Sequence, residues 1–248
     1  KVQHIIENLI GTHQYRDKTW DEIFQTLKNS PHEISVLGSG SFADVISSPE
    51  WKYVYKIYQR DSAYTSFIHF CSQHQDNPHL PKILKPPKKL HAFHKRSHLS
   101  SDHLYAVKLE KLYDLNDINY KIVEFVSDYA YHYTISTNSN HLLHDPFDPN
   151  SSRIAEYTLD DIIDMYPKYP IRQLLDTIKQ IFSKCRFRLD LHDGNFLQRL
   201  DGTIVIIDPL YEPNDIPTSI DFIQNKTPDD FRDIKPQTKT IQGPTYKK

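Results

Sequence analysis

Runs of apolar and β-branched residues predict several strands in the first half of the chain. They occupy residues 33–47, 51–58 and 103–112, and a glycine-rich turn divides the first run in two. A further short apolar run, 204–207, follows the turn-forming pair Asp201-Gly202. This last pattern predicts a hairpin near residue 200.

Helical periodicity dominates the stretches between and after these strands. It predicts helices over residues 61–75, 115–134, 158–166 and 171–187. The last is the most regular, with one apolar face formed by Leu174, Leu175, Ile178, Ile181, Phe182 and Cys185. Residues 2–10 and 19–28 predict two more helices, which we expect to form an N-terminal helical cap over residues 1–30.

Composition narrows the class of protein only moderately. The chain has 248 residues, 38% of them hydrophobic and 25% charged, with a formal net charge of −2, so charge selects no class of partner. No run of 18 apolar residues occurs, which predicts that there is no transmembrane segment. Cys71 and Cys185 lie far apart without a Cys-x-x-Cys pair, which argues against structural zinc and favours a reducing, cytoplasmic location.

The segment 188–208 carries the strongest chemical pattern. Asp190 is followed by Asn195 five residues later and by Asp208 eighteen residues later, with the predicted hairpin between the last two. A phosphotransferase uses one carboxylate to orient and deprotonate an acceptor hydroxyl, and an amide and a second carboxylate to hold Mg²⁺. The alternative is that Asp190 and Asn195 are simply turn-forming residues.

Two of the six glycines, Gly38 and Gly40, lie in the first strand pair. The pattern Gly-x-Gly-x-Phe-x-x-Val is typical of a nucleotide-binding loop in which backbone N–H groups approach phosphates, although Ala43 stands where a third glycine is usual. It predicts nucleotide contacts from residues Gly38, Ser39, Gly40, Ser41, Phe42 and Val45. An ordinary hairpin is the alternative, because a lone Gly-x-Gly is weak evidence.

Lys56 lies in the apolar run 51–58, eleven residues after Val45. This is the spacing at which a kinase strand supplies a lysine to the nucleotide phosphates. A kinase also places a glutamate on the next helix to pair with that lysine, but residues 61–75 contain no glutamate. We therefore predict that Lys56 pairs with Asp208 or Asp61, and with no residue from Phe67 to Gln75.

The strand at 103–112 occupies the place of a kinase hinge. Leu109 would be the gatekeeper, and the backbone of Glu110 and Leu112 would meet adenine. Before this strand, residues 82–98 hold six Lys or Arg, three His and no acid. The insert predicts a site for an anionic ligand (an inositol polyphosphate, an anionic lipid, nucleic acid or another polyanion) made by Lys85, Lys88, Lys89, Lys95 and Arg96. A solvated loop is the alternative.

Together these motifs occur in the one order that builds a phosphotransferase. Between about His32 and Tyr211 the chain resembles the small serine/threonine protein kinases of T-seven-like bacteriophages. The resemblance rests on the glycine loop, Ser48-Pro49, residues 61–67, Asp-x-His-x-Gly-Asn at 190–195 and Asp208-Pro209.

What the resemblance implies is an α+β, bilobal protein-kinase-like fold. The N-lobe would span residues 31–112, a reduced C-lobe 113–234 and a flexible tail 235–248. The activity implied is ATP- and Mg²⁺-dependent (or Mn²⁺-dependent) phosphorylation of Ser or Thr on a protein substrate, in a host cytosol if the chain is encoded by a phage or pathogen. Asp190 would be catalytic, Asn195 and Asp208 would bind metal and Lys56 would anchor phosphates.

The chain also departs from the usual kinase pattern. His192 stands where many protein kinases have a lysine, and no Ala-Pro-Glu segment follows Asp208-Pro209. Two alternatives therefore stay open. One is a phosphotransferase acting on small molecules, and the other is a pseudokinase that serves as a binding scaffold.

Overall fold

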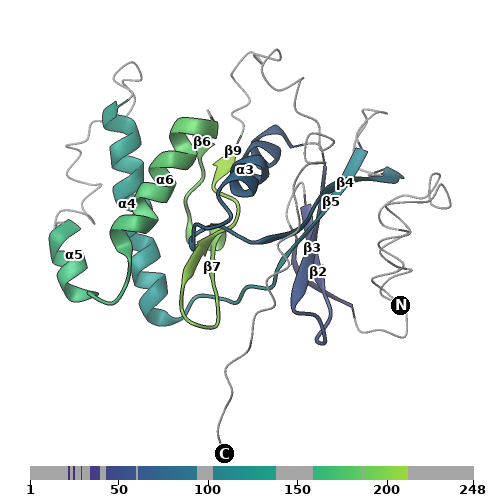
Figure 1. Ribbon diagram of the computed structural model, residues 1–248, viewed down its shortest axis with the longest axis horizontal. Helices are drawn as coiled ribbons and strands as arrows, with labels where there is room; N and C mark the ends of the chain where they lie inside the picture. Colours follow the sequence, from purple (N-terminus) through teal and green to yellow (C-terminus); the bar gives the residue numbers. More distant parts are fainter. Residues whose placement is uncertain are drawn as a thin grey trace, which may run out of the picture.

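The chain has a mixed α+β architecture. The computed structural model describes residues 22, 25, 29, 34–39, 43–59, 61–93, 103–137, 159–185 and 187–211. A five-stranded sheet forms one end of the described part, and three helices, α4, α5 and α6, form the other (Figure 1). Helix α3 lies between the sheet and α6 (Figure 1).

The large sheet is antiparallel throughout, with the strand order β1-β2-β3-β5-β4. Its strands are β1 (Ser35–Ser39), β2 (Ala43–Ser47), β3 (Tyr53–Gln59), β4 (Ile83–Phe93) and β5 (His103–Glu110). Side chains alternate between the two faces of a strand, and the buried core on the α3 side includes Val54 and Tyr58 of β3. Lys56, which lies between them in this alternation, therefore faces the interior of the molecule.

Four helices occupy the four internal stretches for which the sequence predicts them. They are α3 (Ser62–Gln73), α4 (Asp117–Thr137), α5 (Leu159–Met165) and α6 (Ile171–Cys185). The predicted apolar face of α6 is confirmed as buried, except that Phe182 is half-buried and Thr177 takes a buried place. Thr177 is tolerated there because its hydroxyl donates to the Gln173 carbonyl and accepts from the Asn77 amide.

Two short antiparallel pairs follow α6 and hold the segment 188–211 together. Strand β6 (Arg188–Leu189) pairs with β9 (Leu210–Tyr211), and β7 (Phe196–Gln198) pairs with β8 (Ile204–Ile206). The predicted hairpin is thus confirmed. Gly202 in its turn has φ = 84°, a left-handed conformation that favours glycine.

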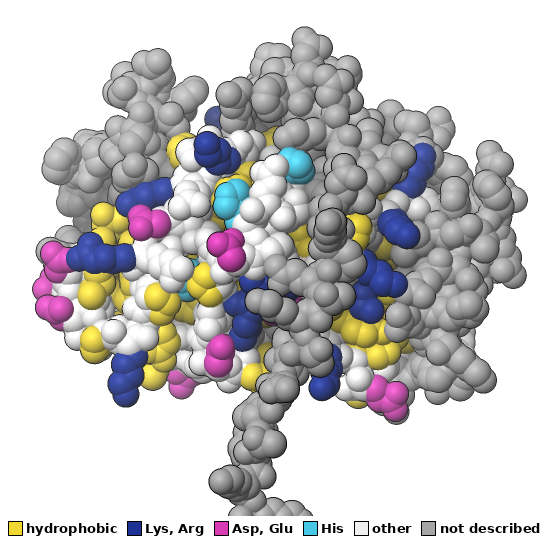
Figure 2. Space-filling model, in the orientation of Figure 1, with side chains coloured by type: hydrophobic (Ala, Val, Ile, Leu, Met, Phe, Trp, Pro, Cys, Tyr) yellow, Lys and Arg dark blue, Asp and Glu magenta, His cyan; other side chains and the backbone are white. Residues whose placement is uncertain are grey.

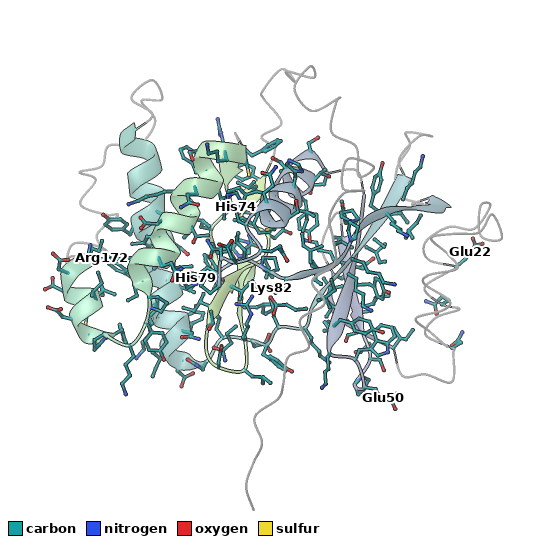
Figure 3. The ribbon with its side chains drawn as sticks, in the orientation of Figure 1. Glu22, Glu50, His74, His79, Lys82 and Arg172 are labelled. Atoms are coloured by element: carbon teal, nitrogen blue, oxygen red, sulfur yellow. The ribbon has the colours of Figure 1, made fainter. Side chains whose placement is uncertain are left out.

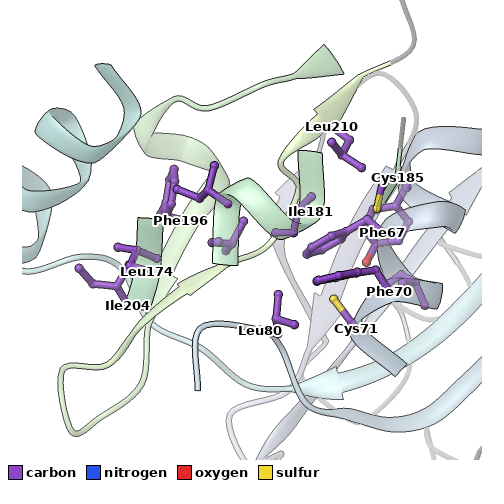
Figure 4. Close-up of a cluster of buried hydrophobic side chains, with 14 of the residues drawn as sticks. Phe67, Phe70, Cys71, Leu80, Leu174, Ile181, Cys185, Phe196, Ile204 and Leu210 are labelled. Carbon is purple, nitrogen blue, oxygen red and sulfur yellow. The ribbon is translucent and has the colours of Figure 1, made fainter. Parts of the chain in front are cut away.

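One hydrophobic core joins α3, α6 and the two short pairs. Figure 4 shows its main members, which are Phe67, Phe70, Cys71, Leu80, Leu174, Ile181, Cys185, Phe196, Ile204 and Leu210. Both cysteines are buried in this core, and neither forms a disulfide. Burial is the largest cause of the raised pKa of Cys71, which keeps that thiol protonated and unreactive.

Three predictions about the chain's organisation have different outcomes. Residues 83–93 of the basic stretch form strand β4, which pairs with β5 and buries Ile83 and Leu90. Residues 94–98, the tail 235–248 and nearly all of the N-terminal cap lie outside the described residues. Among the helices that are described, none is both long and apolar enough to cross a membrane.

Candidate active site

Lys56 and Asp208, which are 152 residues apart in the sequence, form an ion pair. The distance from Lys56 Nζ to Asp208 Oδ2 is 2.7 Å. Lys56 is held by the centre of the large sheet, because β3 is paired on both sides, with Val45 and Val107 opposite Lys56. The Lys56 side chain is 11% exposed and that of Asp208 is 38% exposed, so the pair lies at the edge of the interior with Asp208 toward solvent.

The surroundings of Lys56 confirm the predicted choice of partner. Asp208 is its acid partner, and the helix supplies instead the ring of Tyr64, whose centroid lies 3.6 Å from the Lys56 ammonium. Asp61 is committed locally as the N-cap of α3, accepting a hydrogen bond from the Tyr64 backbone N–H at 2.9 Å. Burial raises the pKa of Asp61, and the nearby Asp208 carboxylate adds to this shift.

Backbone hydrogen bonds bring Asp190, Asn195 and the Asp208 segment into one frame. The backbone N–H of Asp190 donates to the carbonyl of Pro209 at 2.7 Å, and that of Ile207 donates to the carbonyl of Asn195 at 2.9 Å. The Asn195 side-chain amide donates to the Asp190 carbonyl at 2.7 Å. These contacts tie the loop 190–195 to both neighbours of Asp208, so the predicted catalytic and metal-binding residues share one small region.

His192 lies over this loop with a defined ring orientation. The Gly194 backbone N–H donates to its Nδ1 at 3.2 Å, so Nδ1 is the acceptor and the proton of the neutral ring is on Nε2. Nε2 is 3.9 Å from Asp190 Oδ2, at the solvent-facing side of the loop. A Cβ at position 194 would lie 2.9 Å from the His192 Cε1 atom, so glycine leaves room for this ring position.

Asn195 and Asp208 fit the donor set of a hard divalent cation. The NH₂ group of Asn195 is used by the Asp190 carbonyl, which leaves the amide oxygen as the atom that can bind a metal. Asp208 accepts from Lys56 through Oδ2 and retains a second carboxylate oxygen. Within the described residues no group of three or more His, Cys, Asp or Glu could hold a metal. Two oxygen ligands suit Mg²⁺, which keeps several waters.

The predicted nucleotide loop is described in part. Gly40, Ser41 and Phe42 lie outside the described residues, whereas Gly38, Ser39 and Val45 lie in the β1–β2 hairpin. A Cβ at Gly38 would meet no atom within 4 Å, and Gly38 is not among the glycines with positive φ. Among the described residues, neither packing nor backbone strain therefore requires glycine at this position.

The predicted hinge is held at both of its ends. At one end, the Glu110 backbone N–H donates to the Lys82 carbonyl at 3.0 Å, and its side chain accepts from the Lys82 backbone N–H at 2.8 Å. At the other end, Tyr113 and Gln198 exchange two backbone hydrogen bonds of 2.8 Å. Leu112 lies between these fixed points, and Leu109 is buried at the end of β5.

Sequence reasoning missed three residues that support this region. Arg199 forms an ion pair with Glu110, His79 hydrogen-bonds the Ile204 carbonyl through Nδ1 at 2.8 Å, and Asn119 donates to the Gly202 carbonyl at 2.9 Å. Figure 3 shows His79 beside the β7–β8 hairpin and Lys82 on the side of the hairpin that faces the large sheet. No local signal marks these residues, because their partners are 83 to 125 residues away along the chain.

The basic residues of β4 lie on an edge strand of the sheet. Lys85, Lys88 and Lys89 are exposed, whereas Lys95 and Arg96 lie outside the described residues. Lys and Arg side chains are spread over the sheet side of the molecular face drawn in Figure 2. Lysine and proline on an edge strand hinder pairing with other chains, which gives these residues a structural role. The anion site predicted for them stays a prediction.

The function of this protein has to be inferred from its structure, because comparisons with known proteins found no match. Neither the protein-family models nor the curated proteins nor the solved structures gave a match to this chain. The fold and the site define an α+β protein in which Lys56, Asp190, Asn195 and Asp208 come together at the junction of a sheet and a helical region.

Proposed function

We propose that this protein is an ATP- and Mg²⁺-dependent phosphotransferase with a bilobal protein-kinase-like fold, acting on Ser or Thr of a protein substrate. The observation that carries the proposal is the ion pair between Lys56 and Asp208, joined by the Asp190–Pro209 hydrogen bond to the loop of Asp190 and Asn195. A lysine, two carboxylates and an amide in this order and proximity are the polar groups of phosphoryl transfer.

Each group has a distinct role in this proposal. Lys56 leaves Asp208 for the nucleotide phosphates, whose charge its ammonium neutralises. Asp190 orients the acceptor hydroxyl and takes its proton. The Nε2–H of His192, which lies 3.9 Å from Asp190 Oδ2, would donate to the transferred phosphoryl group. Asn195 and Asp208 would hold Mg²⁺, which would neutralise charge on the phosphates when bound.

A protein acceptor is favoured by the accessibility of the proposed base. The Asp190 side chain is 47% exposed and that of His192 is 57% exposed, so a hydroxyl on a large molecule can reach them. A small-molecule phosphotransferase stays the second candidate for the same site. The two buried thiols, which form no disulfide, fit a reducing, cytoplasmic setting.

The test is transfer of labelled phosphate from ATP by the purified chain, with and without Mg²⁺, to a protein mixture and to a panel of small alcohols. We expect Mg²⁺-dependent labelling of Ser or Thr in protein. The matched variants are Asp190→Asn and, as the control, Asp176→Asn on the exposed surface of α6. Asp190→Asn is expected to slow transfer by about 10²- to 10⁴-fold while ATP still binds.

Three outcomes would count against the proposal. Labelling of small alcohols but not of protein would show that the substrate is a small molecule. Binding of ATP without transfer to any acceptor would favour a scaffold. Failure of the parent protein to bind Mg²⁺ and ATP at all would exclude both kinds of phosphotransferase.

A further inference from the structure

Helix α3 presents an aromatic ring to Lys56 at the place where its sequence offers no carboxylate. The helix, SAYTSFIHFCSQ, contains no acidic residue, and its N-cap Asp61 is used to accept from the backbone of Tyr64. Tyr64 is 2% exposed, and its ring centroid is 3.6 Å from Lys56 Nζ. An ammonium this close to the face of a ring is attracted by the ring's quadrupole, most strongly when both are shielded from water.

We propose that Tyr64 is the residue that positions Lys56 for phosphate binding, through its aromatic face. This inference rests on the proposed phosphotransferase function and concerns the same site. The ring does what a helix carboxylate would otherwise do, since it keeps the ammonium on the α3 side of the site. It also does so without adding a negative charge.

The charges around Lys56 show why a neutral partner matters. Asp208 is its ion-pair partner, and Asp61 is a second carboxylate that interacts with it electrostatically. A third carboxylate would leave the group with a larger negative charge close to the position proposed for the nucleotide phosphates. Because the Tyr64 ring is neutral, the Lys56 ammonium still attracts a polyphosphate, and the site repels the polyphosphate less than it would with a third carboxylate.

The position of the Tyr64 ring is in turn set by both the sheet and the helix. Its centroid is 4.8 Å from that of Tyr58 on β3, with the rings edge-to-face at 74°, and 6.3 Å from that of Phe67 one turn further along α3. Tyr58 and Phe67 are both buried. A displacement of α3 would therefore move the ring away from Lys56, so the geometry of the phosphate site depends on the position of this helix.

The hydroxyl group of Tyr64 allows a matched control. It is buried and has no hydrogen-bond partner among the described residues, so Tyr64→Phe removes only that polar group while keeping the ring. Tyr64→Leu and Tyr64→Met remove the ring and keep an apolar side chain, and the unbranched Met is included in case Leu packs too poorly to fold. Circular dichroism and the melting temperature establish which variants are folded.

The first measurement is binding of ATP with Mg²⁺ by calorimetry. We expect Tyr64→Phe to bind as the parent does, and the ring-free variants to bind about 10- to 30-fold more weakly. Transfer should show the loss mainly in KM for ATP and less in kcat, because the ring holds a binding group and does not touch the acceptor. Equal affinity in the parent and a folded ring-free variant would overturn the proposal.

The second measurement needs no nucleotide and separates this inference from the proposed function. Acylation of Lys56 by acetic anhydride, followed by mass spectrometry, reports how well the ring covers and holds the ammonium. We expect Lys56 to react about tenfold faster in Tyr64→Leu and Tyr64→Met than in the parent and Tyr64→Phe. Equal rates in all folded proteins would overturn the role of Tyr64, whereas a parent that binds no ATP would overturn the proposed function alone.

Discussion

The guanidinium of Arg199 and the carboxylate of Glu110 form a two-point ion pair. Nη2 lies 2.6 Å from Oε1 and Nε lies 2.9 Å from Oε2, with both side chains 18% exposed. Arg199 also donates to the carbonyls of Pro78 and Leu80. This one side chain therefore ties the β7–β8 hairpin to the end of β5 and to the segment that follows α3.

Replacement of Arg199 by Met is expected to lower the free energy of unfolding by about 3 kcal/mol, because it leaves the Glu110 carboxylate, only 18% exposed, without its ion-pair partner. Urea unfolding measures this. The double variant Arg199→Met with Glu110→Gln should be more stable than the sum of the two single changes predicts. As a control, Arg172→Met breaks an ion pair with Asp160 whose side chains are 64% and 78% exposed, and should cost less than about 1 kcal/mol. Equal losses at Arg199 and Arg172 would contradict this account.

The buried His79 predicts a loss of stability in acid. Burial lowers its pKa below the ordinary value of 6.5, and its Nε2 atom has no hydrogen-bond partner in the part of the chain that the structure describes. The unfolded chain binds this proton more readily than the folded one, so stability is full above pH 6.5 and falls as pH decreases below it. His79→Asn keeps a donor for the Ile204 carbonyl but does not titrate. Between pH 7.5 and 5.5 its free energy of unfolding should fall less steeply than that of the parent, and parallel curves would refute the assignment.

Gly38 and Gly202 are expected to respond in opposite ways to replacement by Ala. Gly38→Ala should leave the melting temperature unchanged or raise it slightly, because a Cβ there meets nothing and Ala suits a strand better. It should weaken binding of ATP with Mg²⁺ if phosphates approach this backbone. Gly202→Ala, at φ = 84°, should cost about 1 kcal/mol of stability without changing that affinity. An unchanged affinity in Gly38→Ala would remove this glycine from the proposed site.

Asp208→Asn should abolish the dependence of ATP affinity on Mg²⁺, because it removes the only carboxylate of the proposed ligand pair and the ion-pair partner of Lys56. Calorimetry with ATP, in the presence and absence of Mg²⁺, tests this, with Asp176→Asn as the control. An undiminished Mg²⁺ effect in the Asp208 variant would place the metal elsewhere.

Replacing both Lys88 and Lys89 of β4 by Gln is expected to increase self-association, since charged side chains protect an edge strand. Light scattering over a range of protein concentrations measures this. The predicted anion site adds a second expectation, weaker binding of an inositol polyphosphate in the same variant. Self-association without any change in that binding would leave the two lysines with the structural role alone.

Much of the fold and the order of the site residues follow from local sequence patterns. Apolar periods of two and of about 3.6 residues distinguish strands from helices, and they place α3, α4, α5 and α6 correctly. The restriction of the Lys56 partner to Asp208 or Asp61 was also predictable, because the sequence of α3 contains no acid, and the structure selects Asp208. The basic stretch before β5 was harder to interpret, since its many charges concealed the buried Ile83 and Leu90 of an edge strand.

Only the tertiary structure decided which neutral and distant groups complete the site. Tyr64 has the sequence signature of an ordinary core residue, and its contact with Lys56 exists because α3 packs against the face of the sheet that carries the lysine. Arg199 and Glu110 are 89 residues apart, and no periodic pattern records such a pairing. Local sequence patterns show which face of a segment is buried. The partner of a buried charge depends instead on which distant segments pack together in the folded core.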